Sequence, residues 1–122
     1  MEFQDNKAIY LQIAEWICEK IILRQWPPGE RIPSVRELAV DLEVNPNTVA
    51  RTVEFLQNEG MVYLRRGIGL FVADGAVEAA TAYLRREFIG KDLPRVFRSM
   101  SLLGITAEEF LQGYKAFHHQ SN

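Results

Sequence analysis

Cysteine and histidine are scarce in this sequence. A single thiol, Cys18, occurs among the 122 residues, so an internal disulfide and a thiol-rich metal site are both excluded. Cys18 falls in an apolar helical pattern and is interpreted as core packing rather than as a redox sensor. His118 and His119 are adjacent near the end of the chain without an acidic or thiol companion, which favours a solvated terminus over a metal site. We therefore expect no metal and no cofactor.

Long apolar runs are also lacking. The longest are a few residues, far short of the roughly 20 that span a bilayer, and Met1 to Asp5 has neither the basic start nor the apolar centre of a secretory signal. With 48% of residues hydrophobic and 25% charged, the composition is typical of a folded globular protein. Together with the single cysteine, this predicts a cytoplasmic location and no membrane partner.

An excess of positive charge is absent, and so are the usual catalytic constellations. The net charge is -2, so any binding to nucleic acid has to depend on where a few arginines point. The sequence has no nucleophile with a placed base, no glycine-rich phosphate loop and no cluster of metal ligands. These absences predict that the chain is not an enzyme.

Two helices are predicted in the first third of the chain. Apolar residues recur at helical spacing from Lys7 to Trp26, and the run Pro27-Pro28-Gly29 ends that pattern. A short second helix is expected to begin after Ser34, because Ser34 and Glu37 have the spacing of a capping box.

A third helix is predicted directly after the second. Asn45 is a good N-cap, Pro46 occupies the first helical position, and the helix is expected to continue to about Glu59 before Gly60. Only about three residues separate the second and third helices. So short a connection favours a helix-turn-helix over an open pair of antiparallel helices.

The periodicity changes after Gly60. Residues 61–64 and 70–73 are β-prone runs on either side of a glycine-containing tip at 65–69, which predicts a β-hairpin. Helical patterns then return from residue 76. We predict a mainly α protein with a small β-hairpin, in which residues 1–73 form a winged helix-turn-helix domain and residues 74–122 a short α-helical dimerisation tail.

The polar side of the third helix is the candidate reading surface. Asn47, Thr48 and Arg51 lie three or four residues apart, opposite an apolar stripe, and can approach one stretch of the DNA major groove. At the hairpin tip, Arg65 and Arg66 stand next to Gly67 and are expected to contact phosphates or the minor groove. The alternatives are a solvated helix face and ordinary hairpin chemistry, with Asn45 acting only as a cap.

Three separate runs resemble the winged-helix domain of the GntR family, and its YtrA subfamily in particular. They are residues 28–39 (PGERIPSVRELA), 44–51 (VNPNTVAR) and 66–72 (RGIGLFV), within a match over about 8–73. The resemblance implies a one-component repressor that binds a pseudo-palindromic operator in double-stranded DNA as a dimer. It also implies a DNA contact from the second helix, so that the candidate DNA-binding residues are Arg36, Asn45, Asn47, Thr48, Arg51, Arg65, Arg66 and Gly67.

The predicted tail is too small to enclose its own apolar side chains. A symmetric homodimer would bury them, and the candidate dimerisation residues are Leu84, Phe88, Val96, Phe97, Met100, Phe110, Leu111 and Tyr114. The alternative is that the tail packs back on its own winged domain. A second functional alternative is a winged helix that binds another protein. The tail cannot contain the separate effector domain of larger relatives, so the existence of a small-molecule effector stays open.

Overall fold

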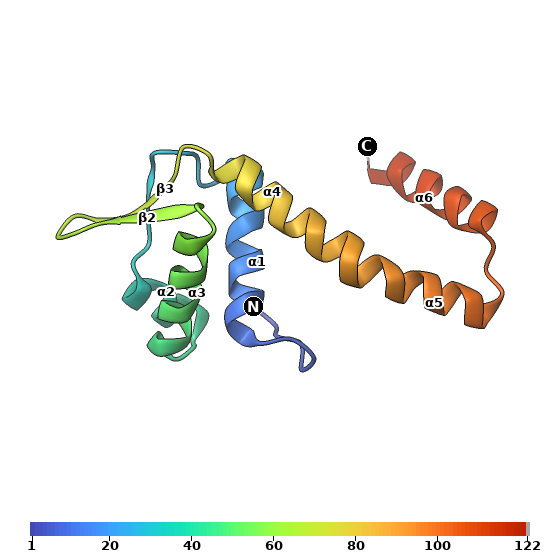
Figure 1. Ribbon diagram of the computed structural model, residues 1–122, viewed down its shortest axis with the longest axis horizontal. Helices are drawn as coiled ribbons and strands as arrows, with labels where there is room; N and C mark the ends of the chain where they lie inside the picture. Colours follow the sequence, from blue (N-terminus) through green and yellow to red (C-terminus); the bar gives the residue numbers. More distant parts are fainter. Residues whose placement is uncertain (122) are drawn as a thin grey trace. The chain divides into compact units, whose positions relative to one another are not determined.

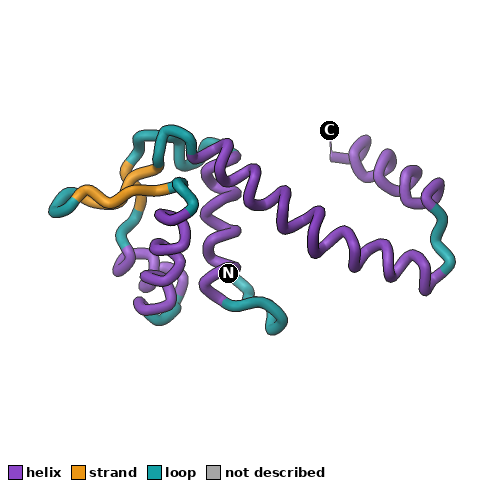
Figure 2. The backbone as a smooth tube through the Cα atoms, in the orientation of Figure 1, coloured by secondary structure: helices purple, strands orange, loops and turns teal. Residues whose placement is uncertain are grey.

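The computed structural model describes the backbone of residues 1–121 and the side chains of residues 1–120. It divides into two compact units, residues 1–84 and residues from 85 onward. The first unit contains α1 (Ile9–Ile22), β1 (Arg31–Ile32), α2 (Val35–Leu42), α3 (Pro46–Asn58), β2 (Val62–Arg65), β3 (Gly69–Val72) and most of α4 (Ala76–Glu87). The prediction of a mainly helical winged-helix fold is confirmed (Figure 2).

Helix α1 forms one wall of the core. Ile13, Ile17 and Ile21 are fully buried at successive i, i+4 positions, which is the spacing that brings side chains onto one face of a helix. The prediction that this helix continues to Trp26 is wrong, because it ends at Ile22. Arg24 takes a left-handed conformation with φ of 63°, and the backbone N–H of Gln25 donates to the carbonyl of Lys20. This local turn ends the helix before the prolines.

The caps of α2 and α3 match their sequence signatures. The Glu37 N–H donates to Ser34 Oγ and the Ser34 N–H donates to Glu37 Oε1, both at 3.1 Å, which completes the capping box. Asn45 Oδ1 accepts from the Asn47 N–H at 2.8 Å, with Pro46 at the first helical position. Both helix starts are therefore fixed by their own local sequence.

The hairpin belongs to a three-stranded antiparallel sheet in the order β1-β3-β2. Tyr63 pairs with Phe71 between β2 and β3, and Arg31 pairs with Phe71 between β1 and β3. The two-residue strand β1 was not predicted. Figure 1 shows the β2–β3 hairpin extending beyond the helices of this unit.

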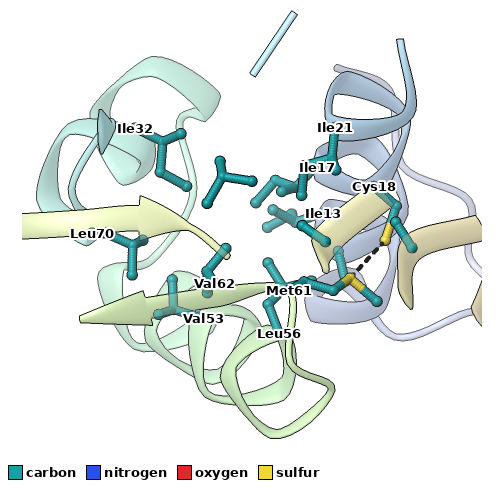
Figure 3. Close-up of a cluster of buried hydrophobic side chains, with 14 of the residues drawn as sticks. Ile13, Ile17, Cys18, Ile21, Ile32, Val53, Leu56, Met61, Val62 and Leu70 are labelled. Carbon is teal, nitrogen blue, oxygen red and sulfur yellow. Dashed lines mark hydrogen bonds between the residues drawn. The ribbon is translucent and has the colours of Figure 1, made fainter. Parts of the chain in front are cut away.

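A single apolar core holds the first unit together. It gathers side chains from α1, α2, α3, all three strands and the start of α4 (Figure 3). Cys18 is fully buried, and its Sγ lies 3.4 Å from Met61 Sδ. Burial raises the pKa of the Cys18 thiol to about 12, with smaller contributions from nearby carboxylates, first among them Glu15. Cys18 is thus an inert core residue, as predicted.

Phe55 on α3 also packs within this unit. Helical spacing puts Phe55 near the outer side of α3, yet its side chain is only partly exposed. Its ring makes an edge contact with Tyr83 of α4, with centroids 5.1 Å apart. Ala76 and Ala80 of the same helix are fully buried. The first turns of α4 therefore complete the core of the winged helix.

The second unit is helical throughout its described residues. It contains the end of α4, a π-helical turn at Phe88–Asp92, α5 (Leu93–Leu103) and α6 (Ala107–Ser121). Gly104 ends α5 in a left-handed conformation, and Thr106 with Glu109 forms a capping box at the start of α6. Among the described side chains from residue 85 to residue 120, none is buried.

Candidate nucleic-acid interface

Helix α3 has one fully buried side and one exposed polar side. Val49 and Leu56 are completely inaccessible to solvent, whereas Asn47 and Arg51 are exposed on the opposite side and Thr48 lies half-buried at its edge. Glu54, one turn after Arg51, is exposed too. The side that carries the predicted reading residues is therefore free of contacts with the core of the first unit.

The start of α1 lies next to this polar side. A recess of about 370 Å³ lies between the two helices. Its walls are formed by Ala8, Ile9, Tyr10, Asn47, Thr48 and Arg51. The three predicted residues of α3 thus come together at one concave site, and α1 supplies its other wall.

A direct contact joins Arg51 to α1. The guanidinium carbon of Arg51 lies 3.9 Å from the centroid of the Tyr10 ring, which is cation–π geometry. Next to Arg51 in sequence, Thr52 is fully buried, and its hydroxyl donates to the Tyr10 carbonyl at 2.8 Å. The hydroxyl also lies 3.2 Å from the Thr48 carbonyl. These contacts fix the first turn of α1 against α3.

Arg36 lies on the first turn of α2, close to the start of α3. Its side chain is exposed. A second recess, of about 680 Å³, is lined by Ser34, Val35, Arg36, Pro46 and Leu64. Leu64 belongs to β2, so this recess brings together α2, α3 and the β2–β3 hairpin, which is the wing of the fold. Asn45 is exposed as well, but its side-chain oxygen is engaged by the Asn47 N–H.

The two arginines of the wing take different positions. Arg65 is the last residue of β2, and its guanidinium lies 5.6 Å from the Phe71 ring. Tyr63 stacks on the same ring at 5.6 Å with an interplanar angle of 18°. Arg66 and Gly67 instead form the exposed tip, where the Ile68 N–H donates to the Arg65 carbonyl and Gly67 has φ of 76°. Of the two arginines, Arg65 therefore lies beside the aromatic rings of the sheet, and Arg66 lies in the exposed tip.

The acidic groups near the interface include one with an altered pKa. Hydrogen bonds from the backbone and the side chain of Ser34 lower the pKa of the Glu37 carboxyl. Glu37 is therefore negatively charged over the physiological range, one residue after Arg36. The interface is accordingly a set of individually placed cations rather than a uniformly basic surface.

Within residues 1–121, histidine, cysteine and acidic side chains form no group of three or more that could hold a metal ion. No helix in this range has the length and apolar character needed to cross a membrane.

Comparison with known proteins agrees with this geometry. The model of the family described as "Bacterial regulatory proteins, gntR family" matches residues 9–72, which extend from the start of α1 to the end of β3. The chain belongs to the GntR family. The HTH-type transcriptional regulator YhcF of Bacillus subtilis is 42% identical over 118 residues, covering 95% of this chain and 94% of YhcF.

Two further relatives are informative. The HTH-type transcriptional repressor YtrA of Bacillus subtilis is 38% identical over 73 residues, which cover 60% of this chain and 56% of YtrA. A crystal structure of a GntR-family regulator from Bacteroides thetaiotaomicron has a TM-score of 0.75 and 43% identity, covering 94% of this chain and all of that one. As a GntR-family member, this chain is a DNA-binding transcriptional regulator and not an enzyme.

The sequence prediction missed the part that α1 plays in this interface. Tyr10 was not among the candidate residues, although it contacts Arg51. The available signal was Thr52, a polar residue on the otherwise apolar side of α3, which has to find a hydrogen-bond partner when it is buried. That partner is the Tyr10 carbonyl.

Proposed function

We propose that α3 reads an operator sequence in the DNA major groove while the wing tip contacts the neighbouring backbone. The observation that carries this proposal is the exposure of Asn47 and Arg51 on the side of α3 opposite its buried stripe. Asn47 is suited to an adenine edge, Thr48 to a thymine methyl or a phosphate, and Arg51 to guanine or a phosphate.

The remaining predicted residues are assigned supporting contacts. Arg36 approaches the DNA from the first turn of α2, and Arg66 with Gly67 contacts phosphates or the minor groove from the wing tip. Arg65 adds positive charge beside the tip. Asn45 orders the start of α3 through its cap and so holds Asn47 at the groove. The reading surface then lies entirely within residues 1–73.

We further propose that residues 74–122 pair two copies of the chain. Phe88, Phe97 and Tyr114 are 51%, 51% and 60% exposed, and apolar surface of this extent is usually covered by a partner. The other residues assigned to the interface are Val96, Met100, Phe110 and Leu111, together with Leu84, which is half-buried against the core of the first unit. A two-fold dimer would bind a pseudo-palindromic operator with half-sites about one helical turn apart.

A dimer on its operator would act as a repressor in the cytoplasm, where chromosomal DNA is accessible. The name of the relative YtrA as a transcriptional repressor supports this sign of regulation. Occupation of a promoter-proximal operator by two winged helices would exclude polymerase.

The test begins with selection of bound sequences from a random DNA pool by the full-length protein. Arg51→Ala is expected to weaken binding to the selected operator by about ten- to a hundredfold, the usual value of one good arginine–base contact. Arg24→Gly, which removes an exposed arginine at the end of α1 opposite Tyr10 and suits the left-handed backbone there, is the matched control and should bind like the unaltered protein. A pool that yields no enriched sequence would refute sequence-specific reading. Equal operator affinity of the Arg51→Ala variant would remove Arg51 from the reading site.

A further inference from the structure

We propose that Tyr10 is a positioning residue for DNA reading, whose ring holds the Arg51 guanidinium in the orientation that enters the groove. This inference rests on the proposed role of Arg51. It extends the reading surface from α3 to the first turn of α1, a segment of the winged helix outside the helix-turn-helix itself. Figure 1 shows α1 and α3 side by side.

The contact places the flat face of the Arg51 guanidinium against the Tyr10 ring. The guanidinium carbon lies over the Tyr10 ring at 3.9 Å. A guanidinium that rests on an aromatic ring uses its flat face, whereas its N–H donors lie in its own plane. The contact with Tyr10 therefore leaves the donors of Arg51 available for a base edge or a phosphate.

The backbone that carries the Tyr10 ring is itself held in place. Thr52 ties the Tyr10 carbonyl to α3 through a buried hydroxyl. The segment before α1 is fastened as well, since the Gln12 amide accepts from the Gln4 N–H and donates to the carbonyls of Gln4 and Lys7. The support under Arg51 is thus connected to the folded unit on both sides of Tyr10.

Arg51 also has a potential acidic partner on its own helix. Glu54 lies three residues further along the same exposed side of α3, and residues at this spacing are neighbours on a helix surface. Within residues 1–121, Arg51 forms no ion pair with Glu54 or any other carboxylate. In its position over Tyr10, the Arg51 guanidinium is not engaged in an ion pair with a carboxylate of the described residues. A side chain ordered before binding also loses less rotamer freedom when the DNA arrives.

The experiment compares Tyr10→Leu with Tyr10→Phe in the full-length protein. Both are assayed on the selected operator and on operators changed at the base pair to which Arg51→Ala is most sensitive. Tyr10→Leu is expected to lower discrimination between these sites by about three- to fivefold, the usual value of an exposed cation–π contact. Tyr10→Phe keeps the ring and should discriminate like the unaltered protein. In an Arg51→Ala background, Tyr10→Leu should cause no further loss of discrimination.

A second measurement is independent of how well the variants fold. In the unaltered protein, the ring current of Tyr10 should move the Arg51 side-chain Hε resonance upfield in the NMR spectrum, and Tyr10→Phe should retain that shift. An unshifted Arg51 resonance, or a Tyr10→Phe variant that loses as much discrimination as Tyr10→Leu, would overturn the positioning role of the ring. Unchanged discrimination in a folded Tyr10→Leu variant would overturn it too.

The outcomes separate this inference from the proposed function. If Arg51→Ala binds the operator normally, the reading role of Arg51 fails and the positioning role of Tyr10 fails with it. If Arg51→Ala binds weakly while folded Tyr10→Leu discriminates normally, the inference about Tyr10 alone is wrong and the proposed role of Arg51 stands.

Discussion

The two units of this chain use apolar side chains in opposite ways. In the first unit, Ile13, Ile17 and Leu56 are completely inaccessible to solvent. In the second unit, Leu102 is 84% exposed and Phe97 is 51% exposed, although both units are built from helices with apolar stripes. An apolar pattern in the sequence therefore predicts that a face will be covered. It does not specify whether the chain's own residues or another molecule will cover that face.

This difference suggests a division of labour. The first unit completes its own core and leaves Asn47, Arg51 and Glu54 on the exposed side of α3. The second unit presents more apolar surface than it covers. A dimeric regulator of a two-fold operator requires both a rigid DNA-binding unit and a surface that pairs two copies of the chain.

The largest expected effect tests the comparison with one substitution made in each unit. Leu56→Ala removes a fully buried side chain of α3 and should lower the free energy of unfolding by about 2–5 kcal/mol. Leu102→Ala is the matched change in α5 and should alter it by less than about 0.5 kcal/mol, because Leu102 is 84% exposed and is not among the residues assigned to pairing. Urea titration of both variants measures the two values. Equal losses would mean that Leu102 is buried in solution and would break the comparison.

A smaller effect is expected when the two wing arginines are compared. Arg66→Ala removes the cation at the tip, so operator affinity should fall by about five- to tenfold and the slope of log affinity against log salt should decrease by about one unit. Arg65→Ala should cost less, because Arg65 is the last residue of β2 whereas Arg66 lies in the exposed tip itself. Binding isotherms over a range of salt concentrations give both quantities. A larger loss for Arg65→Ala would reverse the assignment of the wing contact.

Local signals explain how much of the fold was predictable. The caps at Ser34 and Asn45 depend on neighbouring residues, so the starts of α2 and α3 were predicted correctly. The end of α1 was not, because Arg24 adopts a left-handed conformation that is uncommon for arginine. Strand β1 was missed because only two residues form it and its pairing partner, Phe71, is distant in sequence.

The same distinction applies to the candidate site. The exposed side of α3 follows from helical periodicity, so Asn47 and Arg51 could be identified from their spacing. The contacts of Phe55 with Tyr83 and of Arg51 with Tyr10 join different helices. Their partners are specified by the packing of α1, α3 and α4 and not by any local pattern, which is why neither contact could be predicted from the sequence.

The smallest expected effect at neutral pH concerns Cys18. The Cys18 thiol should resist alkylation in the folded protein. In the variant Leu102→Cys, the exposed thiol introduced at position 102 should react within seconds to minutes. Because burial raises the pKa of the Cys18 thiol from 9.0 to about 12, the folded state binds this proton more tightly than the unfolded chain does. The stability linked to Cys18 is therefore complete below pH 9.0 and declines as pH rises towards about 12.

The control for this pH dependence is Cys18→Ala. Denaturant titrations between pH 8 and pH 11 should show a shallower decline in unfolding free energy for the alanine variant than for the unaltered protein. Rapid alkylation of Cys18 at neutral pH, or identical pH profiles for the two proteins, would contradict the buried position of the thiol.

The division of labour between the units is tested most directly by binding to a complete operator and to an isolated half-site. The variant Phe97→Glu introduces charge on the exposed apolar surface of the second unit and leaves the first unit unaltered. Its affinity for the half-site should equal that of the unaltered protein, while its affinity for the complete operator should fall towards the half-site value as sedimentation shows dissociation to monomers. If the Phe97→Glu variant stays dimeric and retains full operator affinity, pairing through this surface is contradicted. If the variant loses half-site binding, the first unit does not bind DNA independently of the second.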